Sequence, residues 1–162
     1  MSAVVYVMRG IPGCGKTWRA RRLLEKLDSE RYSIVSSDEI MFERYQRFCP
    51  DRLSEVHAEC FQRFCEILEG PEEGVIVDNT NISEWEWHKY VAVAKLVGRR
   101  VVLQDIVART LEDVRTCWRR QRWQDGRRLP AEVFDRLVGR YWREPQPRED
   151  GFSIHRSFLS RT

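Results

Sequence analysis

Two kinds of segment alternate along the chain, and the spacing of their apolar residues distinguishes them. Short runs rich in apolar residues, typical of buried strands, lie at residues 4–8, 32–36, 75–77 and 101–107. Apolar residues recur every three or four positions, as on one face of a helix, at residues 16–27, 39–69 and 83–97. This alternation predicts an α/β three-layer sandwich, in which helices cover both faces of a mostly parallel sheet of roughly four to five strands.

Two pairs of residues mark the starts of predicted helices. Ser83 with Glu86, and Thr110 with Asp113, each place a hydroxyl three residues before a carboxylate, which is the pattern of a capping box. Gly98 ends the first of these helices. The second is predicted to continue to about Gln124.

The C-terminal part of the chain is predicted to hold one more helix. The pair Asp125-Gly126 breaks the preceding helix, and Pro130 suits the first turn of the next one. Residues 144–162 form a tail or contain a short edge strand at residues 152–155. Because no linker, repeat or low-complexity segment interrupts the chain, residues 1–162 are expected to form a single domain.

A phosphate-binding loop follows the first predicted strand. The pattern G-x-x-x-x-G-K-[ST] is met, between a strand and a helix, by Gly10, Ile11, Pro12, Gly13, Cys14, Gly15, Lys16 and Thr17. Glycines let backbone N–H groups face an anion, while Lys16 and Thr17 supply a cation for phosphate and a hydroxyl for Mg²⁺. The loop therefore predicts a P-loop NTPase-type fold that binds ATP, GTP or another nucleoside triphosphate with Mg²⁺; the alternative is a glycine-rich turn without a ligand.

Polar residues follow the third predicted strand, at the sheet edge where ligands bind in open parallel sheets. Asp78 comes directly after that strand and fits a carboxylate that holds Mg²⁺ together with Thr17. A turn-stabilising role for Asp78 is the alternative. Asn79 and Asn81 are candidates to orient a substrate group while they shape the same loop.

The second predicted strand is followed by Asp38, the candidate for catalysis. A carboxylate at this edge can take the proton of an acceptor hydroxyl during phosphoryl transfer. The alternative is that Asp38 caps a helix beginning near Glu39. His57 lies on the next helix among apolar residues, and is either a packed histidine or a residue near the acceptor.

Arginine is concentrated in a stretch that straddles the predicted helix break. One acid, Asp125, accompanies Arg115, Arg119, Arg120, Arg122, Arg127 and Arg128. This composition predicts a lid over residues 115–130, with a solvated helix face as the alternative. A lid arginine can reach a phosphate in transfer, and Arg120 and Arg122 are the candidates for catalysis.

Composition excludes several other classes of protein. The chain is 42% hydrophobic with a net charge of +3, its five cysteines lack ligand spacing, and no apolar run is long enough to cross a bilayer. An intracellular, cytoplasmic protein without a zinc site, disulfide framework or membrane contact is expected. Residues 109–162 carry 13 Arg, no Lys and 8 acids, which makes a nucleic acid partner plausible.

Four motifs in order resemble those of the 5′-hydroxyl polynucleotide kinases. They are the phosphate-binding loop, Ser36–Glu39, Val77–Asn81 and the stretch 119–130, and the similarity covers residues 3–142. The resemblance implies transfer of the γ-phosphate of ATP to the 5′-OH end of RNA or DNA.

The resemblance also implies roles for individual residues. Asp38 would be the general base, and the loop of Asn79 and Asn81 would lie in the acceptor site. The family places an acceptor-binding arginine near the position of Met41, and Arg44 is the nearest arginine here. Two other functions stay open: a kinase of a nucleoside, sugar or sugar nucleotide, and a nucleotide-dependent binding protein without catalysis.

Overall fold

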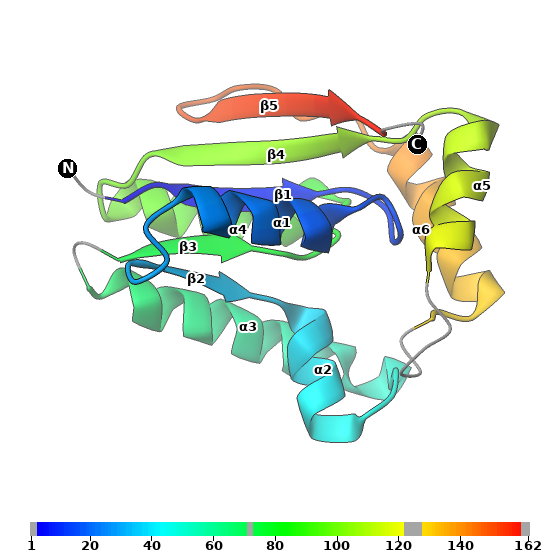
Figure 1. Ribbon diagram of the computed structural model, residues 1–162, viewed down its shortest axis with the longest axis horizontal. Helices are drawn as coiled ribbons and strands as arrows, with labels where there is room; N and C mark the ends of the chain where they lie inside the picture. Colours follow the sequence, from blue (N-terminus) through cyan, green and yellow to red (C-terminus); the bar gives the residue numbers. More distant parts are fainter. Residues whose placement is uncertain (1–2, 71–72, 122–127, 160–162) are drawn as a thin grey trace.

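A five-stranded parallel sheet forms the centre of the molecule (Figure 1). The computed structural model describes residues 3–70, 73–121 and 128–159. The strands are β1 (Val5–Arg9), β2 (Tyr32–Val35), β3 (Gly74–Val77), β4 (Val101–Val107) and β5 (Ser153–Phe158), and their order in the sheet is β2-β3-β1-β4-β5. The predicted parallel α/β fold is confirmed.

Helices cover both faces of this sheet, because alternate side chains of each central strand are buried on opposite sides. Val5 and Val7 of β1 pack in one cluster with α3 (Leu53–Leu68) and α4 (Glu84–Leu96). Met8 lies in a second cluster with residues of α1 (Lys16–Lys26). The carboxyl ends of β1, β2 and β3 therefore meet between two helical layers, beside the start of α1.

The predicted helical stretch over residues 39–69 forms two helices. These are α2 (Ser37–Tyr45) and α3, and a 3-10 turn at Pro50–Arg52 precedes α3. Gln46 ends α2 in the left-handed conformation, with φ 55°, which turns the chain sharply away from the helix. Helix α2 projects from the end of β2, at the same edge of the sheet as the loop between β1 and α1 (Figure 1).

The C-terminal elements differ in detail from their predicted bounds. Helix α5 (Leu111–Arg120) ends four residues before the predicted Gln124, because Gln121 is extended. Pro130 precedes α6 (Ala131–Arg143) as its cap residue and is not in its first turn. The predicted break at residues 125–126 lies outside the described residues.

The predicted edge strand at residues 152–155 is longer in the structure. Strand β5 pairs in parallel with β4 from Ser153 to Phe158. Most of its residues are half-exposed or exposed, so the apolar pattern marks its bounds weakly.

No helix among the described residues is long and apolar enough to span a membrane.

Candidate active site

The loop between β1 and α1 requires glycine at two positions. Gly13 and Gly15 have φ of 82° and 96°, in the region that residues with a Cβ rarely adopt. A Cβ on Gly13 would also lie 2.0 Å from the carbonyl oxygen of Cys117, whereas one on Gly15 would meet no described atom within 4 Å. Gly13 thus allows α5 to pack directly on the loop, and Gly15 leaves space beside the start of α1.

The amino-terminal end of α1 faces the same loop. Its cap residue, Gly15, has no side chain, and its first turn contains no acid, so the N–H groups of that turn suit an anion. The Lys16 side chain is 9% exposed, and its Nζ donates to the carbonyl oxygen of Ile11 at 3.2 Å. Backbone dipoles and one ammonium group therefore converge on a site suited to a phosphate chain.

Thr17 and Asp78 meet at the end of β3. Thr17 Oγ1 donates to Asp78 Oδ2 at 2.8 Å, and Asp78 Oδ1 is buried without a hydrogen-bond partner among the described residues. Burial raises the pKa of Asp78 above its ordinary value, against the opposing effects of Lys16 and the Thr17 hydrogen bond. A buried carboxylate oxygen that lacks a donor is suited to a hard cation.

The surroundings of this pair fit Mg²⁺. A cavity of about 250 Å³ opens beside Thr17 and Asp78, with Arg21, Glu39 and Arg63 in its walls. Mg²⁺ usually keeps several waters and takes one or two protein oxygens together with phosphate oxygens. Among the described residues, no group of three or more His, Cys, Asp or Glu side chains can hold a metal by itself. The Thr17 hydroxyl and Asp78 carboxylate are thus suited to share Mg²⁺ with a nucleotide.

Replacing Asp78 with Asn is expected to stabilise the metal-free protein at neutral pH by about 1 kcal/mol, because a buried charge with an unsatisfied oxygen is removed. Since the pKa of Asp78 is raised in the fold, its stabilising contribution is full below pH 3.8 and is lost as pH rises through that pKa. Urea unfolding across this pH range measures both effects.

The same variant should lose the additional stability that Mg²⁺ with ATP gives the wild-type protein, because a site that binds only the folded state stabilises it. Equal protection of both proteins by Mg²⁺ with ATP would contradict the metal role of Asp78. If the metal-free Asp78→Asn protein were less stable than the wild type, the claim that the buried charge of Asp78 destabilises the fold would be contradicted.

Asp38 lies exposed in the first turn of α2. The cap of this helix is Ser36, whose Oγ accepts from the backbone N–H of Glu39 at 3.3 Å. The alternative that Asp38 caps a helix beginning near Glu39 is therefore wrong. The Asp38 charge contributes to the raised pKa of Asp78, which places both carboxylates in one electrostatic environment.

Asn79 joins the end of β3 to the start of α2. Its Oδ1 accepts from the backbone N–H of Ser37 at 2.8 Å, and its Nδ2 donates to Tyr90 Oη at 3.4 Å and Cys60 Sγ at 3.5 Å. Asn79 is 8% exposed. Its amide therefore positions the residue that precedes Asp38, and its contact with an acceptor stays a prediction.

Asn81 shapes the next turn of the same loop. It adopts the left-handed conformation, with φ 47°, and its Nδ2 donates to the carbonyl oxygen of Met8 at 2.8 Å. The backbone N–H of Gly10 also donates to the carbonyl oxygen of Thr80, at 3.0 Å. These bonds connect the loop after β3 to the end of β1 and to the beginning of the phosphate-binding loop.

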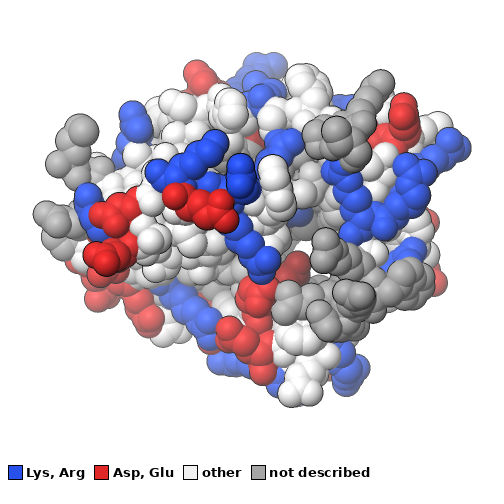
Figure 2. All heavy atoms as spheres, viewed as in Figure 1, with Lys and Arg blue, Asp and Glu red and all other residues white. Residues whose placement is uncertain are grey.

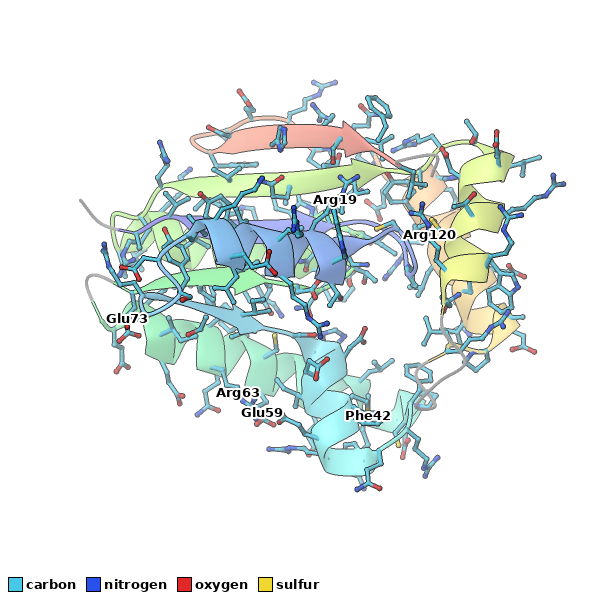
Figure 3. All side chains as sticks on the ribbon, viewed as in Figure 1. Arg19, Phe42, Glu59, Arg63, Glu73 and Arg120 are labelled. Carbon is cyan, nitrogen blue, oxygen red and sulfur yellow. The ribbon has the colours of Figure 1, made fainter. Side chains whose placement is uncertain are left out.

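Arg44 is engaged on the outer side of α2. It pairs with Glu55 of α3 at 3.0 Å and also with Glu59, while its side chain remains 43% exposed. Arg63 pairs with Glu59 as well, at 2.7 Å (Figure 3). Arg44 and Arg63 therefore share one carboxylate. For Arg44 to bind an acceptor, as predicted, these ion pairs would have to open.

The predicted lid is described on both sides of residues 122–127. Arg120 ends α5, and Figure 3 shows it between this helix and the phosphate-binding loop. Burial raises the pKa of the Cys117 thiol, whereas the positive charges of Lys16 and Arg120 lower it. Cys117 packs against the phosphate-binding loop. The second catalytic candidate, Arg122, lies outside the described residues.

A buried ion pair lies at the end of β1, directly before the phosphate-binding loop, and none of the sequence motifs predicts it. Arg9 and Asp105 are each 1% exposed and pair at 3.0 Å. Arg9 also donates to the carbonyl oxygen of Ile82 and lies over the ring of Tyr141 at 4.9 Å. The end of β1 is thus tied to β4, to Ile82 after β3 and to α6, although these segments are far apart in sequence.

Fold and site together define a nucleotide-binding P-loop domain of the kinase-like type. The model of the AAA domain family matches residues 5–144, and the chain therefore belongs to that family. Human NEDD4-binding protein 2 is 33% identical over 103 residues, which are 63% of this chain and 6% of that protein. The chain thus spans a small part of this relative.

Solved structures share the fold at low sequence identity. Kti12 of Chaetomium thermophilum in complex with ADP-AlF3 has a TM-score of 0.69 at 20% identity, over 95% of this chain and 88% of that chain. A chain of the Pnkp1/Rnl/Hen1 RNA repair complex has a TM-score of 0.66 at 17% identity, over 86% of this chain and 44% of that chain. A gluconokinase from Sinorhizobium meliloti 1021 has a TM-score of 0.63 at 13% identity, over 98% of this chain and 84% of that chain. These neighbours differ in activity, so the fold alone does not identify an acceptor.

Proposed function

We propose that this domain is a Mg²⁺-dependent phosphotransferase that moves the γ-phosphate of ATP, or of another nucleoside triphosphate, to the 5′-hydroxyl end of RNA or DNA. The observation that carries the proposal lies on the side of the site that would bind the nucleotide. There the Thr17 hydroxyl donates to Asp78, whose second carboxylate oxygen is buried without a hydrogen-bond partner among the described residues. Asp38, exposed on α2, lies in the same electrostatic environment.

The chemistry proposed for these side chains is a direct displacement at phosphorus. The acceptor oxygen forms a bond to the γ-phosphorus while the bond to the β,γ-bridging oxygen breaks, and ADP leaves. Asp38 takes the proton of the hydroxyl, and Lys16 with the loop N–H groups binds the phosphates. Bound Mg²⁺ would neutralise charge on the phosphate oxygens beside Thr17 and Asp78. Arg120 and Arg122 are proposed to stabilise the transferring group.

A polynucleotide acceptor is supported by charge and by motif order. Figure 2 shows Lys and Arg side chains on the side of the molecule where α5 and α6 lie, as well as elsewhere on the same face. Residues 109–162 supply 13 Arg against 8 acids. Such a surface suits a phosphate backbone. The RNA repair complex that contains Pnkp1 is also among the structures that share the fold.

A small-molecule kinase is the second candidate, favoured by the gluconokinase whose fold covers 98% of this chain. It would use the same donor side with a different acceptor. A non-catalytic nucleotide-dependent binding protein is the third. Transfer assays separate these functions, because only the first two move the phosphate.

An acceptor panel tests the proposal. Protein, Mg²⁺ and γ-labelled ATP are incubated with 5′-OH RNA, 5′-OH DNA, nucleosides and sugars, including gluconate. We expect label on at least one 5′-OH polynucleotide and none on the same strands with a 5′-phosphate. Label on a nucleoside or sugar alone would replace the first candidate with the second, and label on no acceptor would contradict both.

A further inference from the structure

A hydrogen bond joins α3 to the start of α2, beside the proposed base. Ser37 Oγ lies 3.0 Å from His57 Nδ1, and Ser37 is 6% exposed. The backbone N–H of Ser37 is bound at the same time by Asn79 Oδ1, at 2.8 Å. Ser37 is therefore fixed from two directions, and Asp38 is the next residue along the helix.

Asn79 and Ser37, which this hydrogen bond connects, are each adjacent in sequence to one of the two carboxylates of the proposed reaction. Asp78 precedes Asn79 on the metal side, and Asp38 follows Ser37 on the acceptor side. His57 supports this junction from α3, where its ring is half-buried. A shift of Ser37 would change the position of Asp38 relative to Asp78.

We propose that His57 is a positioning residue for Asp38: its Nδ1 accepts the hydroxyl hydrogen of Ser37 and so holds the start of α2 at the acceptor side of the site. This inference rests on the proposed phosphotransferase function. It assigns to His57 a role through Ser37 and no contact with the acceptor.

The burial of His57 favours the neutral ring that this bond requires, because burial disfavours the charged form of the imidazole. Burial lowers the pKa of His57 below its ordinary value of 6.5. The charges that act on the ring are Asp38 of α2, Glu86 and Lys89 of α4, and Arg140 of α6; the two acids raise the pKa and the two bases lower it. With the neutral ring, Nδ1 accepts from the Ser37 hydroxyl, whereas at low pH both ring nitrogens carry hydrogen, so Nδ1 becomes a donor and the Ser37 hydroxyl has to turn its hydrogen away.

Three variants test the inference. His57→Leu removes the acceptor atom, His57→Asn keeps a polar atom near the place of Nδ1 but does not titrate, and His88→Leu changes an exposed histidine of α4 as a matched control. We expect His57→Leu to lower kcat for transfer to a 5′-OH oligonucleotide by about tenfold, with KM for ATP unchanged. His57→Asn should restore kcat at neutral pH and should show a smaller decrease at acid pH than the wild-type protein, because only the part of the decrease that comes from the general base remains in the variant.

Equal kcat values in His57→Leu and His88→Leu, or the same acid decrease in His57→Asn as in the wild type, would overturn the inference. If the wild-type protein labels no acceptor, the proposed function fails and hydrogen exchange decides the inference alone. Faster exchange of the first-turn amides of α2 in His57→Leu, with none in His88→Leu, would support it; unchanged exchange would overturn it.

Discussion

Replacing Asp38 with Asn is expected to lower the rate of phosphate transfer by about 10²- to 10⁴-fold, the usual contribution of a general base, and to leave ATP affinity nearly unchanged. Asn has the same shape but takes no proton from the acceptor hydroxyl. Asp38 is exposed and Ser36 caps α2, so the fold does not depend on the Asp38 carboxylate.

Single-turnover transfer to a 5′-OH oligonucleotide measures the rate, and calorimetry measures ATP affinity. Asp135→Asn, an exposed change on α6, is the matched control and should transfer at the wild-type rate. A large loss of ATP affinity in Asp38→Asn would move this residue to the donor side of the site. A wild-type rate would remove it from catalysis.

Lys16→Ala is expected to weaken ATP binding by about 10- to 100-fold, the loss that corresponds to one charge-assisted hydrogen bond. The Lys16 ammonium is held over the loop by the carbonyl oxygen of Ile11, directly beside the start of α1. Its removal leaves the backbone N–H groups as the remaining phosphate donors. The transfer rate should fall as well, because the proposed displacement places the same cation beside the phosphates.

Lys26→Ala supplies the control, since Lys26 is an exposed lysine at the other end of α1. Calorimetric titration of ATP with Mg²⁺ into both variants gives the comparison. We expect wild-type affinity for Lys26→Ala. Wild-type affinity and rate in Lys16→Ala would refute the phosphate-binding role of the loop.

Features that depend on neighbouring residues were predictable from sequence. The loop from Gly10 to Thr17 is defined by its own glycines, and the capping box of Ser83 and Glu86 is formed within one turn. The parallel sheet was predictable as well, because buried runs joined by helices favour parallel strands. The placement of Asp78 beside Thr17 was predictable because strand ends meet at one sheet edge.

Features that depend on distant contacts were not predictable. Arg9 and Asp105 are 96 positions apart, and neither has a local pattern that predicts its burial. Arg44 was assigned by its position in the chain, whereas its ion pairs are formed with another helix.

The most direct test of the proposed activity is the position of the label after transfer. A 5′-OH oligonucleotide is incubated with the protein, Mg²⁺ and γ-labelled ATP, and the product is digested to mononucleotides. We expect the label in the 5′-terminal nucleotide as a 5′-monophosphate, with none when the strand ends in a 5′-deoxy group. Label found only in ATP and inorganic phosphate would contradict the account.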